Sequence, residues 1–295
     1  MRANIIDEDF IASLEGLSLD IKQPMKGLFG GTHRSRLYGS SAEFTDFREY
    51  EQGDDLRRID WNLYARFEKL MLKLYTDERQ LHHRIYIDAS ASMKWGIPSK
   101  ADAALKTAAA LGYLSVRALD RISLYAMHGQ TCEEVFANIM GRENFYSAAD
   151  RLNAIKFEGD NDFGAAILHD MRLGNDDGVS FIISDFLTDT DWQQAVDRIL
   201  SVKRQVALIQ ILSQDELNPV AEGRVLLLDS EAADEDDLRN MKAELTRGRL
   251  RAYREAFEYS QGVLRDFCAA RDVSLITLTS DSDPVESIMR GCCRI

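Results

Sequence analysis

Residues 88–92 read Asp-Ala-Ser-Ala-Ser and follow directly on the apolar segment 85–87. In a loop, a carboxylate and two hydroxyls at every second residue can direct three oxygens toward one point. Such oxygen ligands suit a hard divalent cation, Mg²⁺ first and Mn²⁺ or Ca²⁺ next. One carboxylate with two neutral hydroxyls leaves the ion under-neutralised, so an open position can accept a carboxylate from outside. We therefore expect Asp88, Ser90 and Ser92 to hold a metal ion that binds a partner protein.

Two other segments can complete this site. Asp185 follows the apolar run 179–184. Asp160, Asn161 and Asp162 stand together before an expected helix. Two simpler explanations compete: the D-x-S-x-S spacing arose by chance, or its serines only cap a turn. The metal site is favoured because the motif follows an apolar segment and a second apolar segment also ends in Asp.

The elements on either side must position these loops. Segments typical of strands occur at 84–87, 121–127, 179–184, 206–212, 224–228 and 273–278. Segments typical of helices occur at 5–17, 100–119, 163–171, 192–200 and 235–270, with a short helix after Pro284. This alternation predicts an α/β fold, a doubly wound and mostly parallel sheet with helices on both faces. In such a sheet, ligands bind outside the carboxyl ends of the strands, where the strand order reverses.

The first 80 residues differ from the rest. Residues 24–62 are rich in Gly, Ser, Asp and Arg, and residues 70–74 alternate like a strand. We predict an N-terminal extension, 1–80, that packs on a main domain, 81–295. The extension contains a charged cluster, either a recognition or catalytic surface or a salt-bridge network that pins irregular backbone. We favour the network, because adjacent opposite charges can satisfy each other. The cluster comprises Arg48, Asp54, Asp55, Arg57, Arg58, Asp60 and Arg66.

Composition limits the class of protein. Of the 295 residues, 45% are hydrophobic, which suffices for a sizeable core. The net charge of -13 argues against general nucleic-acid binding, which needs basic groups to displace counterions from phosphates. No stretch reaches the roughly 20 apolar residues of a membrane span, and the acidic start is unlike a signal peptide. The four cysteines form no C-x-x-C pair. We expect a cytoplasmic protein with no membrane span and no nucleic-acid partner.

Signals for enzyme chemistry are weak. The sequence lacks the motifs G-x-S-x-G, G-x-x-x-x-G-K-[ST] and H-E-x-x-H. His82 and His83 are adjacent before an expected strand and would face opposite ways. A metal ion near Asp160, Asp162 and Asp185 could hydrolyse phosphoesters or peptides, so a metallohydrolase is the alternative function. We favour a non-enzymatic protein, because no second ligand cluster or general base stands out.

A long run of residues that ends in the metal motif carries a family pattern. It consists of Gly31 to Ser35, Gly39, Glu43, Phe44, Arg48 to Tyr50, Gly53 to Asp55, Arg57, Ile59 to Trp61, Ala65, Arg66, Glu78, Arg79 and Asp88 to Met93. This run resembles the bacterial domain of unknown function 58 family. The D-x-S-x-S-M strand end resembles the metal-ion-dependent adhesion site of von Willebrand factor type A domains. The resemblance continues more weakly to Leu278, so it covers nearly the whole chain.

The resemblance implies a von Willebrand factor type A-like fold with a family-specific N-terminal region. It also implies a partner, a MoxR-type AAA+ ATPase, with which such proteins act on client proteins. By position, it matches residues 88–92 to the first metal loop and Asp185 to the third.

The second metal loop departs from the family pattern. Relatives normally offer Thr in a G-G-T sequence, where this chain has Gly-Asp-Asn at 159–161. Asn161 can still offer an amide oxygen, and Asp160 or Asp162 are alternatives. The departure leaves a degenerate, metal-free scaffold as a third interpretation.

Overall fold

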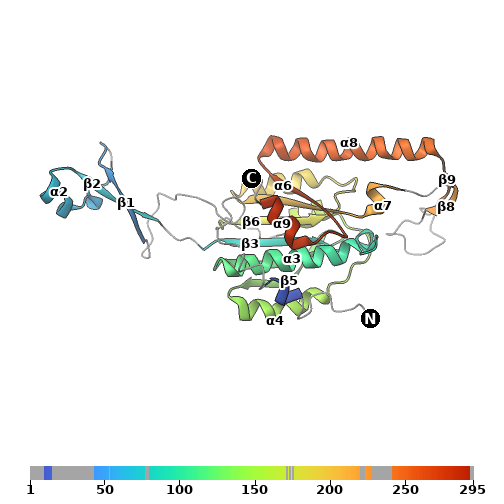
Figure 1. Ribbon diagram of the computed structural model, residues 1–295, viewed down its shortest axis with the longest axis horizontal. Coiled ribbons are helices and arrows are strands. Elements are labelled where there is room, and N and C mark those ends of the chain that lie inside the picture. Colours follow the sequence, from blue (N-terminus) through green and yellow to red (C-terminus); the bar gives the residue numbers. More distant parts are fainter. Residues whose placement is uncertain are drawn as a thin grey trace. The chain divides into compact units, whose positions relative to one another are not determined.

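The computed structural model describes residues 10–14, 43–52, 54–76, 80–170, 172, 174, 176–219, 223–227 and 241–292. The chain divides into two compact units, Gly31–Gln80 and the remainder, Met1–Gly30 with Leu81–Ile295 (Figure 1). That residues 1–80 form an extension packed on the main domain stays a prediction.

A six-stranded sheet forms the centre of the larger unit (Figure 1). Every neighbouring pair of strands is parallel except the last, β4 with β5. From β3, the strands β4 and β5 follow on one side, whereas β6, β7 and β10 follow on the other side. The strand order therefore reverses between β3 and β6. The predicted α/β, doubly wound, mostly parallel sheet is therefore confirmed. Its order is β10 (Ser274–Thr279), β7 (Gln205–Leu212), β6 (Val179–Ser184), β3 (His82–Asp88), β4 (Arg121–His128) and β5 (Thr131–Ile139).

Helices cover both faces of this sheet (Figure 1). Alternate residues of the buried strands divide between two apolar cores, because successive side chains of a strand point to opposite faces. Ile85 and Ile87 pack in the core that contains the Ala-rich helix α3, whereas Tyr86 packs in the other. The first core is covered by α3 (Lys100–Arg117), α4 (Arg142–Asn153) and α9 (Pro284–Cys292), and the second by α5 (Phe163–Leu168), α6 (Trp192–Ser201) and α8 (Arg247–Arg271).

The predicted N-terminal helix, 5–17, is helical at 10–14, and its other residues lie outside the described part of the chain. Leu14 is buried in the core beside α3, and Phe10 and Ile11 pack against that core. None of the helices formed by the described residues combines the length and apolar character needed to cross a bilayer.

The segment predicted as one long helix, 235–270, is not a single helix. Met241–Leu245 forms strand β9, which pairs antiparallel with β8 (Gly223–Leu227). Helix α8 begins only at Arg247, where Thr246 accepts a hydrogen bond from Arg249 N and caps the first turn. The spacing of apolar residues before Thr246 is compatible with a helix. Pairing with β8, however, satisfies the backbone N–H and C=O groups of 241–245 in a strand instead. Residues 235–240 lie outside the described part of the chain.

The smaller unit contains an antiparallel strand pair, β1 (Glu43–Glu49) and β2 (Met71–Thr76). Between these strands in the sequence come a short 3-10 turn, η1 (Leu56–Arg58), and the helix α2 (Trp61–Phe67).

The charged cluster of this unit holds its local structure. Arg48 Nη2 donates to Asp54 Oδ1 over 2.8 Å. Asp60 caps α2 by accepting a hydrogen bond from Asn62 N (2.9 Å), and Lys73 Nζ lies 3.1 Å from the other Asp60 oxygen. These contacts favour a structural role for Arg48, Asp54 and Asp60 over a recognition surface.

Candidate metal centre

The predicted metal loops meet at the carboxyl edge of the sheet, at the point where the strand order reverses. Asp88 is the last residue of β3, and Asp185 directly follows β6 on the neighbouring strand. Two backbone hydrogen bonds of 2.9 Å join the first and second loops, from Ala91 N to Gly159 O and from Glu158 N to Ala89 O. The strand ends and this backbone pairing therefore bring the three loops together.

The Asp88 carboxylate lies at the centre of the site and is 5% exposed. Its Oδ1 accepts hydrogen bonds from Asn161 Nδ2 (2.8 Å) and Ser90 N (3.0 Å), and its Oδ2 accepts one from Ser184 Oγ (2.6 Å). Burial, followed by the nearby Asp185, raises the pKa of Asp88, although these hydrogen bonds act in the opposite direction. Among the described residues, no ion pair reaches Asp88, and a bound cation would stabilise its ionised form.

Two observations on the neutral oxygens of the loops favour a small divalent cation. Ser90 Oγ and Ser92 Oγ lie 2.8 Å apart. Two ligands at right angles around Mg²⁺, each at about 2.1 Å, would lie about 3.0 Å apart. Asn161 is 6% exposed, and its Oδ1 is buried without a hydrogen-bond partner among the described residues. A buried amide oxygen without a donor is costly, and a cation would satisfy it.

The other two candidates in the second loop have different local roles. Asp162 caps α5, because its Oδ1 accepts a hydrogen bond from Ala165 N (3.0 Å). Asp160 is exposed, and its Oδ1 accepts from Asn161 N (2.8 Å). The structure thus brings Asn161, rather than either aspartate, into contact with Asp88.

Asp185 is engaged by residues that the sequence reasoning missed. Its Oδ2 lies 2.5 Å from Lys100 Nζ, and its Oδ1 accepts from Leu187 N (2.9 Å). Lys100 Nζ also contacts Glu216 Oε1, and the Lys100 side chain is 1% exposed. The sequence offered one weak signal, a lysine at the first position of an expected helix just beyond the metal motif. Asp185 therefore contributes charge to the site, while both of its oxygens are already hydrogen-bonded.

The described residues contain no cluster of His, Cys, Asp or Glu that suggests a second kind of metal site. No group of three or more His, Cys, Asp or Glu side chains there is arranged to hold a metal ion. Burial raises the pKa of the Cys132 thiol to about 12, so this cysteine is protonated at neutral pH. The candidate centre is instead a mixed set of one carboxylate, two hydroxyls and one amide oxygen.

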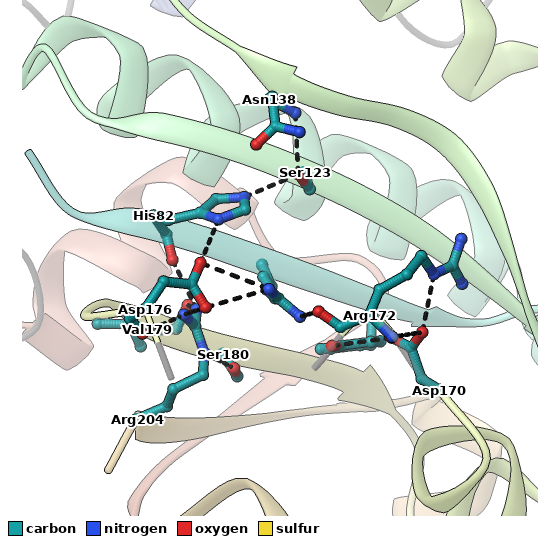
Figure 2. Close-up of polar contacts among 11 residues, drawn as sticks. His82, Ser123, Asn138, Asp170, Arg172, Asp176, Val179, Ser180 and Arg204 are labelled. Atoms are coloured by element: carbon teal, nitrogen blue, oxygen red, sulfur yellow. Dashed lines mark hydrogen bonds and ion pairs between the residues drawn. The ribbon is translucent and has the colours of Figure 1, made fainter. Parts of the chain in front are cut away.

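A second buried polar cluster lies at the opposite, amino-terminal edge of the sheet (Figure 2). His82 Nδ1 contacts Asp176 Oδ2, and Nε2 lies 2.8 Å from Ser123 Oγ. Because a carboxylate only accepts, Nδ1 carries the proton and Nε2 accepts from the hydroxyl. His83 instead lies 3.1 Å from Asp120, which confirms that the two histidines face opposite ways.

Arg204 connects three strands within this cluster (Figure 2). It lies just before β7 and is 2% exposed. Its guanidinium donates to His82 O at the start of β3 (2.6 Å) and to Ser180 Oγ in β6 (2.9 Å). It also forms an ion pair with Asp176 (3.2 Å), which Arg84 shares at 3.1 Å. We assign this cluster a structural role, because most of its polar groups satisfy one another; among the described residues, only Arg84 Nε in this cluster is buried without a hydrogen-bond partner.

The fold and the loop edge define a class of protein, a doubly wound α/β domain with a cluster of polar side chains at its topological switch point, where ligands bind in such folds. Residues 46–259 match the family model described as "Protein of unknown function DUF58", and the chain belongs to that family. The family resemblance seen in the sequence is thereby confirmed.

Several known proteins are similar to this chain. The uncharacterized protein Rv1480 of Mycobacterium tuberculosis and the uncharacterized protein Mb1516 of Mycobacterium bovis are each 28% identical over 237 residues, which cover 79% of this chain and 74% of theirs. Among solved structures, the SpRpn10 VWA domain has 13% identity and a TM-score of 0.41, covering 72% of this chain and 95% of its own. A von Willebrand factor type A protein from Catenulispora acidiphila has 11% identity and a TM-score of 0.39, covering 76% and 43%.

Proposed function

We propose that this chain is a metal-dependent protein-interaction module, an adaptor that works in the cytoplasm with a MoxR-type AAA+ ATPase in assembling or remodelling client proteins. The observation that carries the metal dependence is the buried Asn161 Oδ1, which has no partner among the described residues although it belongs to the amide that contacts Asp88. The family resemblance supports the choice of ATPase.

The side chains divide the task of holding the cation. Asp88 supplies the negative charge, while Ser90, Ser92 and Asn161 supply neutral oxygens. When bound, a divalent cation such as Mg²⁺ offers a Lewis-acidic position to a carboxylate of the partner. Because the direct ligands carry a single negative charge, that position stays attractive to an anion.

An exposed apolar segment lies directly after the first metal loop. Trp95 is 55% exposed and Ile97 is 98% exposed. Gly96, between them, has φ +94°, and a Cβ there would lie 2.8 Å from Ser213 Cβ, so the segment is held close to the carboxyl end of β7. Burying a large apolar side chain contributes about 1.5–3 kcal/mol. We propose that the partner places an apolar surface on Trp95 and Ile97 beside its carboxylate.

Replacing Asp88 by Ala tests the metal site. We expect Asp88→Ala to weaken Mg²⁺ binding by at least about 100-fold, or about 3 kcal/mol, because it removes the buried carboxylate that contacts Asn161 and Ser90. Calorimetric titration with MgCl₂ measures this, and capture of the purified ATPase in Mg²⁺ should weaken in parallel. The control is Asp150→Ala, which removes the same charge from an exposed position of α4 and should change Mg²⁺ affinity by less than about threefold. Unchanged ATPase capture by Asp88→Ala would disprove the metal-dependent adaptor mechanism.

Replacing Ile97 by Asp tests the apolar contact separately from the metal. We expect Ile97→Asp to weaken ATPase capture by about tenfold or more, because one lost apolar contact is worth about 1.5–3 kcal/mol. The Mg²⁺ affinity should change little, since the side chain points into solvent. Surface plasmon resonance with saturating MgCl₂ provides the measurement, and the exposed Leu119, at the far end of α3, gives the control Leu119→Asp. Equal losses of ATPase capture for Ile97→Asp and Leu119→Asp would show that the apolar segment is not part of the interface.

A further inference from the structure

Lys100 is the most unusual charged residue of the candidate metal centre. It is the first residue of the 18-residue helix α3, where the helix dipole disfavours a positive charge. Its side chain is also 1% exposed, and burying an ammonium is costly unless it is paired. Both the helix dipole and the burial therefore disfavour the positive charge of Lys100, and its carboxylate partners must offset both effects.

The two partners of Lys100 are held in place by other elements. Asp185 is fixed by Leu187 N, which donates to Oδ1 over 2.9 Å. Glu216 lies in the short helix α7 (Gln214–Leu217), where its Oε2 accepts from Ser213 N over 2.7 Å in a capping box. One oxygen of each carboxylate therefore remains for the ammonium, and both lie 2.5 Å from Lys100 Nζ. Burial opposes the charged form, but Asp185 and Glu216 together raise the pKa of Lys100, so it is positively charged at neutral pH.

Four charged side chains meet around Asp88 and Lys100, and their charges do not cancel when all four are ionised. Asp88, Asp185 and Glu216 supply three negative charges, and Lys100 supplies one positive charge. The remaining charge of minus two equals that of one Mg²⁺ ion in magnitude. Without Lys100, the same ion would face three uncompensated carboxylates, and Asp185 would have an oxygen free to approach it.

We propose that Lys100 is a resident counter-ion that occupies Asp185, limits the affinity of the site for a divalent cation, and so preserves the attraction of that cation for a partner carboxylate. This rests on the proposed metal-dependent function and adds the residue that tunes it. Lys100 thus acts as a positioning and affinity-setting residue, since its ammonium is directed to Asp185 and Glu216 and not to the neutral oxygens.

The test compares Lys100→Met with the wild-type protein in MgCl₂ titrations. We expect Mg²⁺ to bind the variant at least tenfold more tightly, because a nearby positive charge is lost. Without Mg²⁺ the variant should unfold at a lower temperature, since two buried carboxylates lose their cation, and added Mg²⁺ should raise its Tm more than it raises the wild-type Tm. Capture of the ATPase at saturating Mg²⁺ should weaken. Lys94→Met is the control, because Lys94 is exposed in the turn after the metal motif and solvent screens its charge.

A second variant keeps the proposal testable if Lys100→Met does not fold. Glu216→Gln removes one negative charge and leaves the ammonium in place, so Mg²⁺ should bind it several-fold more weakly than the wild-type protein. Unchanged or weaker Mg²⁺ binding by folded Lys100→Met, or unchanged binding by Glu216→Gln, overturns the role of Lys100. If the wild-type protein and Asp88→Ala bind Mg²⁺ equally poorly, the proposed function itself is wrong, and the role of Lys100 fails with it.

Discussion

Replacing Arg204 by Met should lower the free energy of unfolding by about 3–5 kcal/mol, because it removes a buried guanidinium and leaves its half-buried ion-pair partner and its backbone acceptors unpaired. The guanidinium donates to the carbonyl oxygens of His82 (2.6 Å), Asp176 (2.8 Å) and Val179 (3.2 Å). Met fills a similar volume but donates no hydrogen bond. The acceptors left without a donor lie at the start of β3, at the start of β6 and in the segment before β6; the first two contacts are buried and the third is half-buried.

Urea unfolding followed by circular dichroism measures this loss. Arg204→Lys should recover only part of it, since a single ammonium cannot reproduce the planar set of donors. Arg198→Met provides the control, because Arg198 is exposed on α6 and its substitution should stay within about 0.5 kcal/mol. A loss below about 1 kcal/mol for Arg204→Met would mean that the three strands do not depend on this residue.

Acid should destabilise the protein through His82. Burial lowers the pKa of His82 to about 4 in the folded protein, although Asp176 acts to raise it. In the unfolded chain the pKa is about 6.5. Because the folded protein binds fewer protons between these values, the stabilisation is complete above about pH 6.5 and is lost as the pH falls toward 4. The loss should approach about 3 kcal/mol, or about 1.4 kcal/mol for each pH unit in that window.

His82→Gln isolates this contribution, because it removes the titrating ring. The variant should be less stable at pH 7, yet its stability should change much less between pH 6.5 and pH 4. His128→Gln, a substitution at a half-buried position at the end of β4, should keep the wild-type slope. Asp176 does not contribute to the change in stability between pH 6.5 and pH 4. Burial acts to raise the pKa of Asp176, but Arg204, Arg84 and His82 hold it below its usual value, so Asp176 titrates below this range. A His82→Gln slope equal to that of the wild-type protein would disprove the assignment.

The central strands were predictable from the sequence, and the edge elements were not. Buried parallel strands such as β6 and β7 are continuous apolar runs, because both of their faces are covered. The edge strand β5 has a single buried residue, Phe136, and carries no such run, so the sequence does not predict it. Helix α4 was also missed, although Phe145, Ala148 and Leu152 have helical spacing. The strand β9 was placed in a helix, because its pairing with β8 depends on a residue segment distant from it in the sequence.

The sequence by itself determined that the D-x-S-x-S loop and Asp185 lie at the same edge of the sheet. Each directly follows its own apolar strand, and parallel strands end at one edge. Only the tertiary structure decided what these residues meet. Asn161 contacts Asp88 across 73 residues of sequence, and Lys100 contacts Asp185 across 85. Such contacts leave no local pattern, since they depend on which strands become neighbours and how the loops between them fold back. The physical reason is the same for Arg204 and His82, which lie 122 residues apart and meet only when β3, β6 and β7 pair.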